Sequence, residues 1–149
     1  MVIRDAKLED IDNGLLELYI DGYNMHYDGR KDIFLYMSDE ELRMSLIAQL
    51  DDDMENFILI VENEKIVGYA SYQYKNRATK SLWIDELIID EAYRKHGYGK
   101  RIIEFLRKRA LENECARVEL NCWSFNDVAL AFYKALGYSE QRVVLEKEV

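Results

Sequence analysis

The sequence predicts an α/β fold (α+β in the stricter usage) with a single mixed, mostly antiparallel central sheet and helices on both faces. Two observations carry this prediction. Two β-branched and aromatic runs within residues 56–75 flank a short polar turn, which is the pattern of a β-hairpin and of antiparallel pairing. The C-terminal half then alternates strand, helix, strand and helix, an order typical of β-α-β units and their parallel strands. A sheet that accommodates both patterns is mixed, with helices packed against it.

Length and composition favour a single globular domain over residues 1–149. A chain of 149 residues is large enough for one core and too short for two comfortable ones. Apolar residues make up 49% and charged residues 33%, a balance typical of globular proteins. The opening MVIRDAKLED contains no apolar stretch of signal-peptide length, and no uncharged run is long enough to span a bilayer. We therefore expect a cytoplasmic location and no membrane partner.

The formal net charge is −9, from 29 acidic and 20 basic residues. Such a field repels nucleic-acid phosphates, so it argues against nucleic-acid binding and slightly favours a small cationic partner. The alternative interpretation is that the acidity only maintains solubility. Two cysteines and two well-separated histidines form no metal-binding pattern, so no metal is expected.

The N-terminal half predicts a strand followed by two helices. A short strand covers residues 2–6, and apolar residues then recur at helical spacing over residues 8–27. The second helix spans residues 38–50, where Ser38 and Glu41 form a capping box ahead of leucines at every fourth position. The hairpin described above comes next.

The C-terminal half predicts the remaining elements. Strands are indicated by runs of β-branched and apolar residues, and helices by apolar residues three and four positions apart. In chain order these are a strand over 81–90, a helix through 102–110, a strand over 116–123, a helix over 126–138 with Gly137 as its C-cap, and a last strand over 141–149.

Between the strand over 81–90 and the next helix lies YRKHGYGKRIIEFL, residues 93–106, with glycine at positions 97 and 99. A helix start offers about four unpaired backbone N–H groups and partial positive charge, which suit a phosphate. The glycines lack β-carbons that would hold the phosphate away, and nearby basic residues add full charges. The alternative is a tight turn with a solvated basic face. These basic residues are Arg94, Lys95 and Lys100.

Two common nucleotide motifs do not match this turn. A P-loop requires Gly-Lys followed by Ser or Thr, whereas Arg101 follows Lys100 here. A dinucleotide fingerprint requires a third glycine where this chain has Ile102.

The motif Arg94-x-x-Gly97-x-Gly99, preceded by IDELII and followed by WSFNDVALAFYKALGY, resembles the GNAT superfamily of acyl-CoA-dependent N-acetyltransferases. The resemblance covers about residues 58–138, and the order of elements agrees over the whole chain. It implies that acetyl-CoA is the co-substrate. The chain departs from the usual pattern at Glu91, often proline, and at Lys95, often a small residue, which puts the shape of the loop in doubt.

The resemblance also implies positions for coenzyme A. The turn wraps the pyrophosphate with backbone amides, and the preceding strand carries a bulge, splays from its neighbour and pairs with the pantetheine arm. The asparagine matched by Asn126 bonds that arm, or serves only as the helix N-cap. The implied coenzyme A residues are Leu87, Ile88 and Ile89 on the strand, Arg94, Lys95, His96, Gly97, Tyr98, Gly99 and Lys100 in the turn, and Asn126.

Acetyl transfer to an amine requires proton transfers. A free alkyl amine has a pKa of about 10, so a base must remove its proton before it attacks. The resemblance implies that Glu86 is that base. The alternatives are that Glu86 is only a solvated carboxylate on the strand, or that a chain of waters is the base. An N–H of the bulged strand, such as that of Ile88, would stabilise the oxyanion. Tyr133 matches the tyrosine that protonates the leaving thiolate, with aromatic packing as its alternative role.

The segment between the first two helices matches the region that forms the acceptor cleft in this superfamily. Its aromatic and acidic side chains suit a cationic amine, and we predict transfer to a small amine of that kind. Acetylation of a protein N-terminus or lysine, a non-catalytic coenzyme-A-binding relative and a purely structural module are the alternatives. A homodimer is also possible, since dimers are common in the superfamily. The predicted acceptor residues are Tyr23, Tyr27, Asp28 and Phe34.

Overall fold

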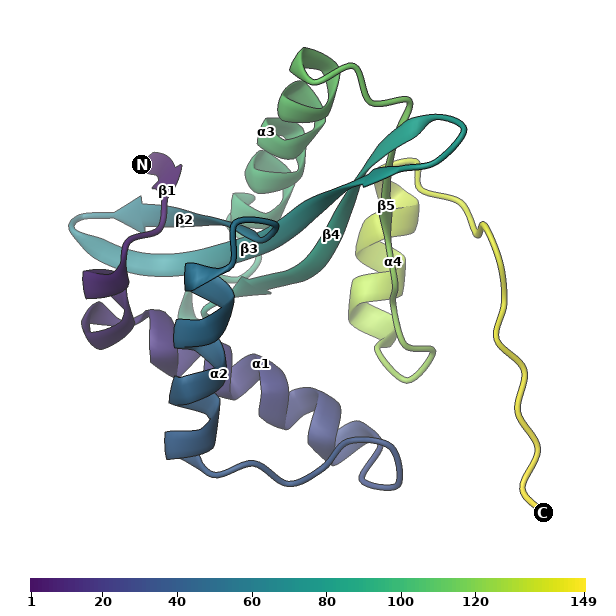
Figure 1. Ribbon diagram of the computed structural model, residues 1–149, viewed down its shortest axis with the longest axis horizontal. Coiled ribbons are helices and arrows are strands. Elements are labelled where there is room, and N and C mark those ends of the chain that lie inside the picture. Colours follow the sequence, from purple (N-terminus) through teal and green to yellow (C-terminus); the bar gives the residue numbers. More distant parts are fainter.

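The structure is a computed structural model that describes all of residues 1–149 (Figure 1). It follows the order of elements expected from the sequence up to the last helix. In chain order the elements are β1 (Val2–Asp5), the 3₁₀ helix η1 (Leu8–Asn13), α1 (Leu15–Gly29), α2 (Asp39–Asp51), β2 (Asn56–Glu62), β3 (Lys65–Asn76), β4 (Lys80–Ile89), the 3₁₀ helix η2 (Glu91–Tyr93), α3 (Tyr98–Glu112), β5 (Arg117–Leu120) and α4 (Asp127–Ala135).

The five strands form one sheet in the order β1-β2-β3-β4-β5. The first three pairs are antiparallel, and only β4 and β5 run parallel. The prediction of a mixed, mostly antiparallel sheet is therefore confirmed. The parallel pair follows from α3, which carries the chain back across the sheet between β4 and β5.

Helices cover both faces of the sheet, as predicted (Figure 1). One core packs α1 and α2 against β2 and β3, around Leu15, Leu42 and Tyr69. The other packs α3 against the opposite face, around Ile58, Leu82 and Leu106, with α4 contributing partly buried residues. Strands β2, β3 and β4 contribute to both cores because alternate side chains point to opposite faces. The site described below lies where β4 passes between these layers.

The predicted hairpin is present, and its turn has a specific backbone cause. Asn63 and Glu64 both have positive φ angles, 49° and 65°, as a two-residue type I′ turn requires. The first predicted helix is less regular than its spacing indicates. Gly14 adopts a φ of 116°, which interrupts the helical hydrogen bonds and separates η1 from α1.

The prediction of a strand over residues 141–149 is wrong. The segment after Tyr138 contains no strand, and none of its backbone groups pairs with the rest of the chain. It extends beside the body of the molecule to the C-terminus (Figure 1). Its β-branched composition favours a strand, but a strand needs a neighbour with which to share hydrogen bonds, and this chain places none there.

The capping box predicted at the start of α2 is confirmed. The Ser38 hydroxyl accepts a hydrogen bond from the Glu41 N–H at 3.2 Å, and Glu41 reaches back to the Ser38 N–H. We expect Ser38→Ala to lower the free energy of unfolding by about 1 kcal/mol, because one helix N–H loses its acceptor. Urea unfolding would measure this. The control is Ser139→Ala, which lies outside any helix; equal stabilities for the two variants would contradict the prediction.

Candidate active site

Strand β4 carries a bulge at its centre and then separates from β5. Ser71 pairs with Glu86 while the next residue of β3, Tyr72, pairs with Ile84, so Asp85 is the additional residue. The pairing of β4 with β5 ends at Ile84. Beyond the bulge, β4 is therefore paired on one side only, and its other edge is open. Both features were expected from the resemblance.

The phase of the β3–β4 ladder decides which backbone groups face the open edge. The Asp90 N–H donates to the Val67 carbonyl at 2.8 Å. Because inward and outward groups alternate along an antiparallel strand, the Ile88 N–H also turns toward β3, and those of Leu87 and Ile89 turn outward. The Arg94 side chain donates to the outward Ile89 carbonyl at 3.1 Å, which agrees with this phase. Ile88, the residue expected to supply the oxyanion donor, therefore turns its N–H away from the open edge, whereas the N–H of Leu87 faces it.

The turn between β4 and α3 presents a continuous row of free backbone donors. None of the six N–H groups from Lys95 to Lys100 donates a hydrogen bond within the protein. A helix start alone leaves about four such groups. The basic side chains of Arg94, Lys95 and Lys100 are exposed around them and form no ion pair. This is the arrangement expected of a site for a phosphate or diphosphate.

Glycine is required at the two positions of the turn for different physical reasons. Gly97 is the N-cap of α3 with a φ of 83°, a left-handed conformation that favours glycine. A β-carbon on Gly99 would lie 3.1 Å from the ring of Phe132, so this glycine lets α3 and α4 approach closely. From the sequence, both glycines were expected to admit phosphate. For Gly99 the packing contact already explains the residue.

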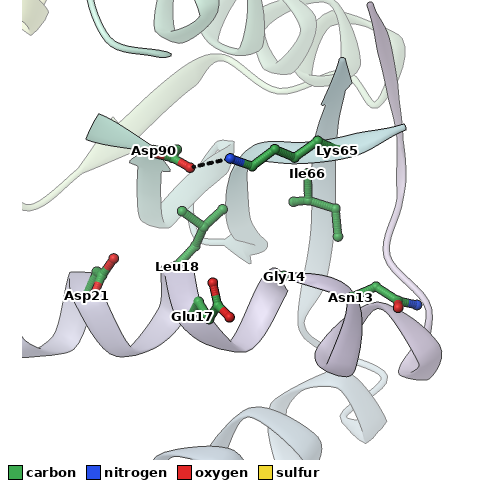
Figure 2. Close-up of a pocket in the computed structure, with 8 residues that line it drawn as sticks. All are labelled: Asn13, Gly14, Glu17, Leu18, Asp21, Lys65, Ile66 and Asp90. Atoms are coloured by element: carbon green, nitrogen blue, oxygen red, sulfur yellow. Dashed lines mark ion pairs between the residues drawn. The ribbon is translucent and has the colours of Figure 1, made fainter. Parts of the chain in front are cut away.

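A separate cavity of about 130 Å³ lies where α1 passes the start of β3 and the end of β4 (Figure 2). Lys65 and Asp90 form an ion pair across it at 3.5 Å, and the carboxylates of Glu17 and Asp21 lie on its α1 side. The surplus of carboxylates disfavours an anion there. This cavity is therefore not a second phosphate site.

Glu86 follows the bulge directly and is partly buried. The Tyr69 hydroxyl donates a hydrogen bond to its carboxylate at 2.7 Å. Burial raises the pKa of Glu86 above its ordinary value and the nearby Asp85 raises it further, while the bond from Tyr69 acts in the opposite direction. A carboxylate whose pKa is raised toward neutrality is suited to accept a proton from an amine.

Tyr69, which hydrogen-bonds this carboxylate, and Glu55, whose own pKa is affected by Glu86, were not predicted from the sequence. Tyr69 is completely buried and its ring stacks on Phe57 at 6.0 Å. Glu55, which immediately precedes β2, has its pKa raised to about 7 by burial and by the nearby Asp85. Tyr69 pairs with Ile88 rather than with Glu86, so only the folded strand register brings its hydroxyl to the carboxylate.

Tyr133 lies on α4 and is partly buried among aromatic rings, 5.1 Å from Phe132 and 5.5 Å from Tyr138. Burial raises the pKa of its phenol well above the ordinary value, with smaller contributions from Cys122 and Tyr138. Its hydroxyl forms no hydrogen bond within the protein. The group therefore stays protonated and is free to donate.

Asn126 does cap α4. Its side-chain oxygen accepts from the Ala129 N–H at 3.2 Å, while its amide nitrogen lies 4.0 Å from the Met25 sulfur. The capping alternative is thus correct for the oxygen. The amide nitrogen has no strong partner and can still donate to a ligand.

The predicted acceptor residues divide into two groups. Tyr23 and Phe34 lie edge to face at 6.2 Å, and Phe34 continues into a cluster with His26 and Trp123. Tyr27 instead contacts Tyr36, at 5.9 Å between ring centres. Asp28 is exposed and forms no hydrogen bond or ion pair. The structure therefore assembles one aromatic wall from α1, the following loop and the β5–α4 loop, and leaves Tyr27 and Asp28 apart from it.

Helix α1 brings this wall toward Glu86. A β-carbon on Gly22 would lie 2.8 Å from the Ile88 side chain and 3.8 Å from the Tyr69 hydroxyl. Gly22 therefore permits α1 to pass close to β4 beside the hydrogen-bonded pair of Tyr69 and Glu86. No group of three or more His, Cys, Asp or Glu residues is placed to hold a metal ion. None of the helices combines the length and apolarity needed to cross a membrane.

A bulged strand that splays from its parallel neighbour, followed by a turn of free amides, defines a class of acyl-transfer proteins. Residues 14–138 match the model of the acetyltransferase (GNAT) family. The chain belongs to this family, and the recognition made from the sequence is confirmed.

Individual relatives are distant. The chain is 30% identical to the thialysine N-epsilon-acetyltransferase of Bos taurus over 74 residues, which are 48% of this chain and 44% of that protein. It thus spans less than half the length of that relative. It is 26% identical to the glucosamine 6-phosphate N-acetyltransferase of Arabidopsis thaliana, over 97% of this chain and 94% of that protein. A mutant protein from Bacillus halodurans has the same fold, with a TM-score of 0.91, 25% identity, and coverage of 100% of this chain and 99% of that one.

Proposed function

We propose that this protein transfers an acetyl group from acetyl-CoA directly to the primary amine of a small cationic molecule. One observation carries the proposal: the row of free N–H groups from Lys95 to Lys100 adjoins the open edge of β4, on which Glu86 lies. A diphosphate bound by the turn would direct a thioester arm along this edge. The outward backbone groups of Leu87 and Ile89 are available to pair with such an arm.

The chemistry follows from the groups along this edge. Glu86 removes a proton from the amine, either directly or through a water molecule, so that the neutral amine attacks the thioester carbonyl. The outward N–H of Leu87 stabilises the negative charge that develops on the carbonyl oxygen. Tyr133 donates its phenolic proton to the departing sulfur.

The negative charge of the protein supports a small cationic amine as the acceptor. The chain carries a net charge of −9, and carboxylates of Glu55, Asp85 and Glu86 gather near the bulge. Both relatives named above act, by their names, on small molecules with an amino group. Acetylation of a protein N-terminus or lysine, and binding of coenzyme A without turnover, are the competing functions.

A single assay separates these functions. Release of free thiol from acetyl-CoA is measured with diamines, amino sugars, lysine analogues and peptides with free N-termini, and acetyl-CoA binding is measured by calorimetry. Turnover on a small cationic amine is the expected result. Turnover on peptides alone would favour the protein-directed alternative, and binding without turnover would favour the non-catalytic one. Absence of binding would overturn the proposal.

Tyr69 is proposed to set the pH range of the reaction. Its hydrogen bond lowers the pKa of Glu86 against the effect of burial. Tyr69→Phe removes that bond, so the pKa of Glu86 rises and the base is protonated over a wider range. The acidic limb of the kcat/KM profile should then move to higher pH.

The control for this experiment is Tyr72→Phe, an equally buried tyrosine whose side chain belongs to the other core. It should leave the acidic limb in place. An unchanged limb in Tyr69→Phe, or an equal shift in both variants, would remove Tyr69 from this role.

A further inference from the structure

Part of the aromatic wall closes into a ring of four side chains, which we call the aromatic box: His26, Phe34, Trp123 and Phe125. The centre of the Phe34 ring lies 5.7 Å from that of His26 and 5.5 Å from that of Trp123. The Phe125 ring completes the circuit, at 6.0 Å from Trp123 and 6.3 Å from His26. All four side chains are partly exposed, so the box is accessible to a ligand.

One face of α1 places the box at the gap between β4 and β5. Gly22, His26 and Gly29 are four and three residues apart, so they lie on the same side of the helix. A β-carbon on Gly22 would lie 2.8 Å from the Ile88 side chain, and one on Gly29 would collide with the Phe125 ring. Helix α1 therefore contacts β4 at Gly22 and the β5–α4 loop at Gly29. His26 lies between these two contacts, where β4 has separated from β5.

The hydrogen bond of His26 determines which of its ring nitrogens is free. Nδ1 lies 2.9 Å from the Gly22 carbonyl oxygen. Because a carbonyl oxygen only accepts, Nδ1 carries the proton, and Nε2 of the neutral imidazole keeps its lone pair. Nε2 lies at the end of the ring away from the helix backbone and forms no hydrogen bond within the protein. It is therefore an unused acceptor among aromatic rings.

The box already holds one cation against one of its rings. The Arg30 guanidinium lies 5.7 Å from the centre of the Trp123 ring. Asp32 and Glu146 pair with Arg30 at 2.9 and 2.7 Å, so its charge is compensated and does not repel a second cation. Aromatic faces attract ammonium groups, and the Nε2 lone pair can accept one of their N–H bonds. This combination suits a primary ammonium group.

We infer that the aromatic box binds a second, non-reacting ammonium group of the acceptor, and that His26 accepts a hydrogen bond from it. This inference rests on the proposed function, in which the reacting amine lies at Glu86. The Tyr69 hydroxyl, which bonds Glu86, is 3.8 Å from the β-carbon position of Gly22, and His26 is one helical turn further along α1.

The geometry of α1 also sets the length of the acceptor. One helical turn advances about 5.4 Å, so a chain of several carbon atoms must separate the two nitrogens. The acceptor class is thereby narrowed to α,ω-diamines and longer amines of the same type. His26 is a specificity-determining residue of the proposed reaction, not its base.

Paired substrates test this assignment. Thiol release from acetyl-CoA is measured with α,ω-diamines of increasing length and with n-alkylamines of the same lengths. For the parent protein, kcat/KM of the best diamine should exceed that of its matched alkylamine by roughly tenfold or more. His26→Phe keeps a ring but removes the acceptor, so this ratio should fall several-fold while kcat/KM for the alkylamine stays near parental. His26→Gln retains an amide that can accept and should recover part of the ratio.

The control is Phe105→Leu on α3. Phe105 also has an arginine over its ring, Arg109 at 4.8 Å, but it packs against the other core, so its loss should leave the ratio unchanged. A parental ratio near one, or an unchanged ratio in His26→Phe, would overturn the inference. Turnover on the alkylamines in the same assay would still support the proposed function.

A binding measurement tests the box without turnover. The diamines and alkylamines are titrated into the full chain, and the ring signals of His26 and Trp123 are followed by NMR. A diamine should shift both at concentrations where its matched alkylamine does not, and Gly29→Ala, whose β-carbon displaces Phe125, should weaken the effect. Such shifts without thiol release from any amine would refute the proposed function and leave the box as a diamine site. If no diamine moves either ring, the inference is wrong.

Discussion

Glu86→Gln is expected to lower kcat by about 10²- to 10⁴-fold while leaving the affinity for acetyl-CoA nearly unchanged. Glutamine has almost the same size and can still accept the hydrogen bond from Tyr69, which in the parent measures 2.7 Å. It lacks the basic carboxylate, however, so the protonated amine is no longer converted to the attacking form. The proposed diphosphate site lies in the turn after β4 and is not touched by this change.

Thiol release under saturating substrates measures the loss, and calorimetry with acetyl-CoA measures binding. Glu104→Gln provides the same chemical change on the outer face of α3, where Glu104 pairs only with Arg107. It should retain parental turnover. A Glu86→Gln variant that keeps parental kcat would show that water or another group is the base. Glu55, whose pKa is raised to about 7, would then be the next candidate.

Tyr133→Phe is expected to have the second largest effect, a decrease in kcat of roughly 10²-fold with little change in acetyl-CoA affinity. The phenol is kept protonated by burial and has no hydrogen bond to lose within the protein. Removing its oxygen therefore deletes a proton donor without breaking a structural contact. General acid–base catalysis contributes about 10²- to 10⁴-fold. The loss in Tyr133→Phe is expected at the low end of this range because a thiolate leaves more readily than an alkoxide.

Tyr138→Phe is the matched control, because Tyr138 is also partly buried and its ring lies 5.5 Å from that of Tyr133. Steady-state kinetics and a binding titration on both variants check the prediction. Equal turnover in Tyr133→Phe and the parent would leave Tyr133 with its packing role alone. Equal losses in the two variants would indicate that the aromatic cluster, and not the proton of Tyr133, matters.

The sequence by itself determined the features that depend on neighbouring residues. The capping box of Ser38 and Glu41, the hairpin around residues 62–65 and the helix end at Gly137 all rest on bonds within a few positions. Hydrophobic spacing was also sufficient for most helices and strands, because burial of one face imposes a period of 3.6 or 2. The turn of free N–H groups after β4 was predictable for the same reason, since a helix start is a local structure.

Only the tertiary structure decided which distant groups meet. The bond from Tyr69 to Glu86, the phase that turns the Leu87 N–H outward, and the contact that requires Gly99 each depend on strand register or helix packing. The C-terminal segment of residues 139–149 is the clearest case. Its residues have the composition of a strand, but strand formation requires a partner edge, and hydrogen bonds between segments are decided by the assembled fold and not by local preference.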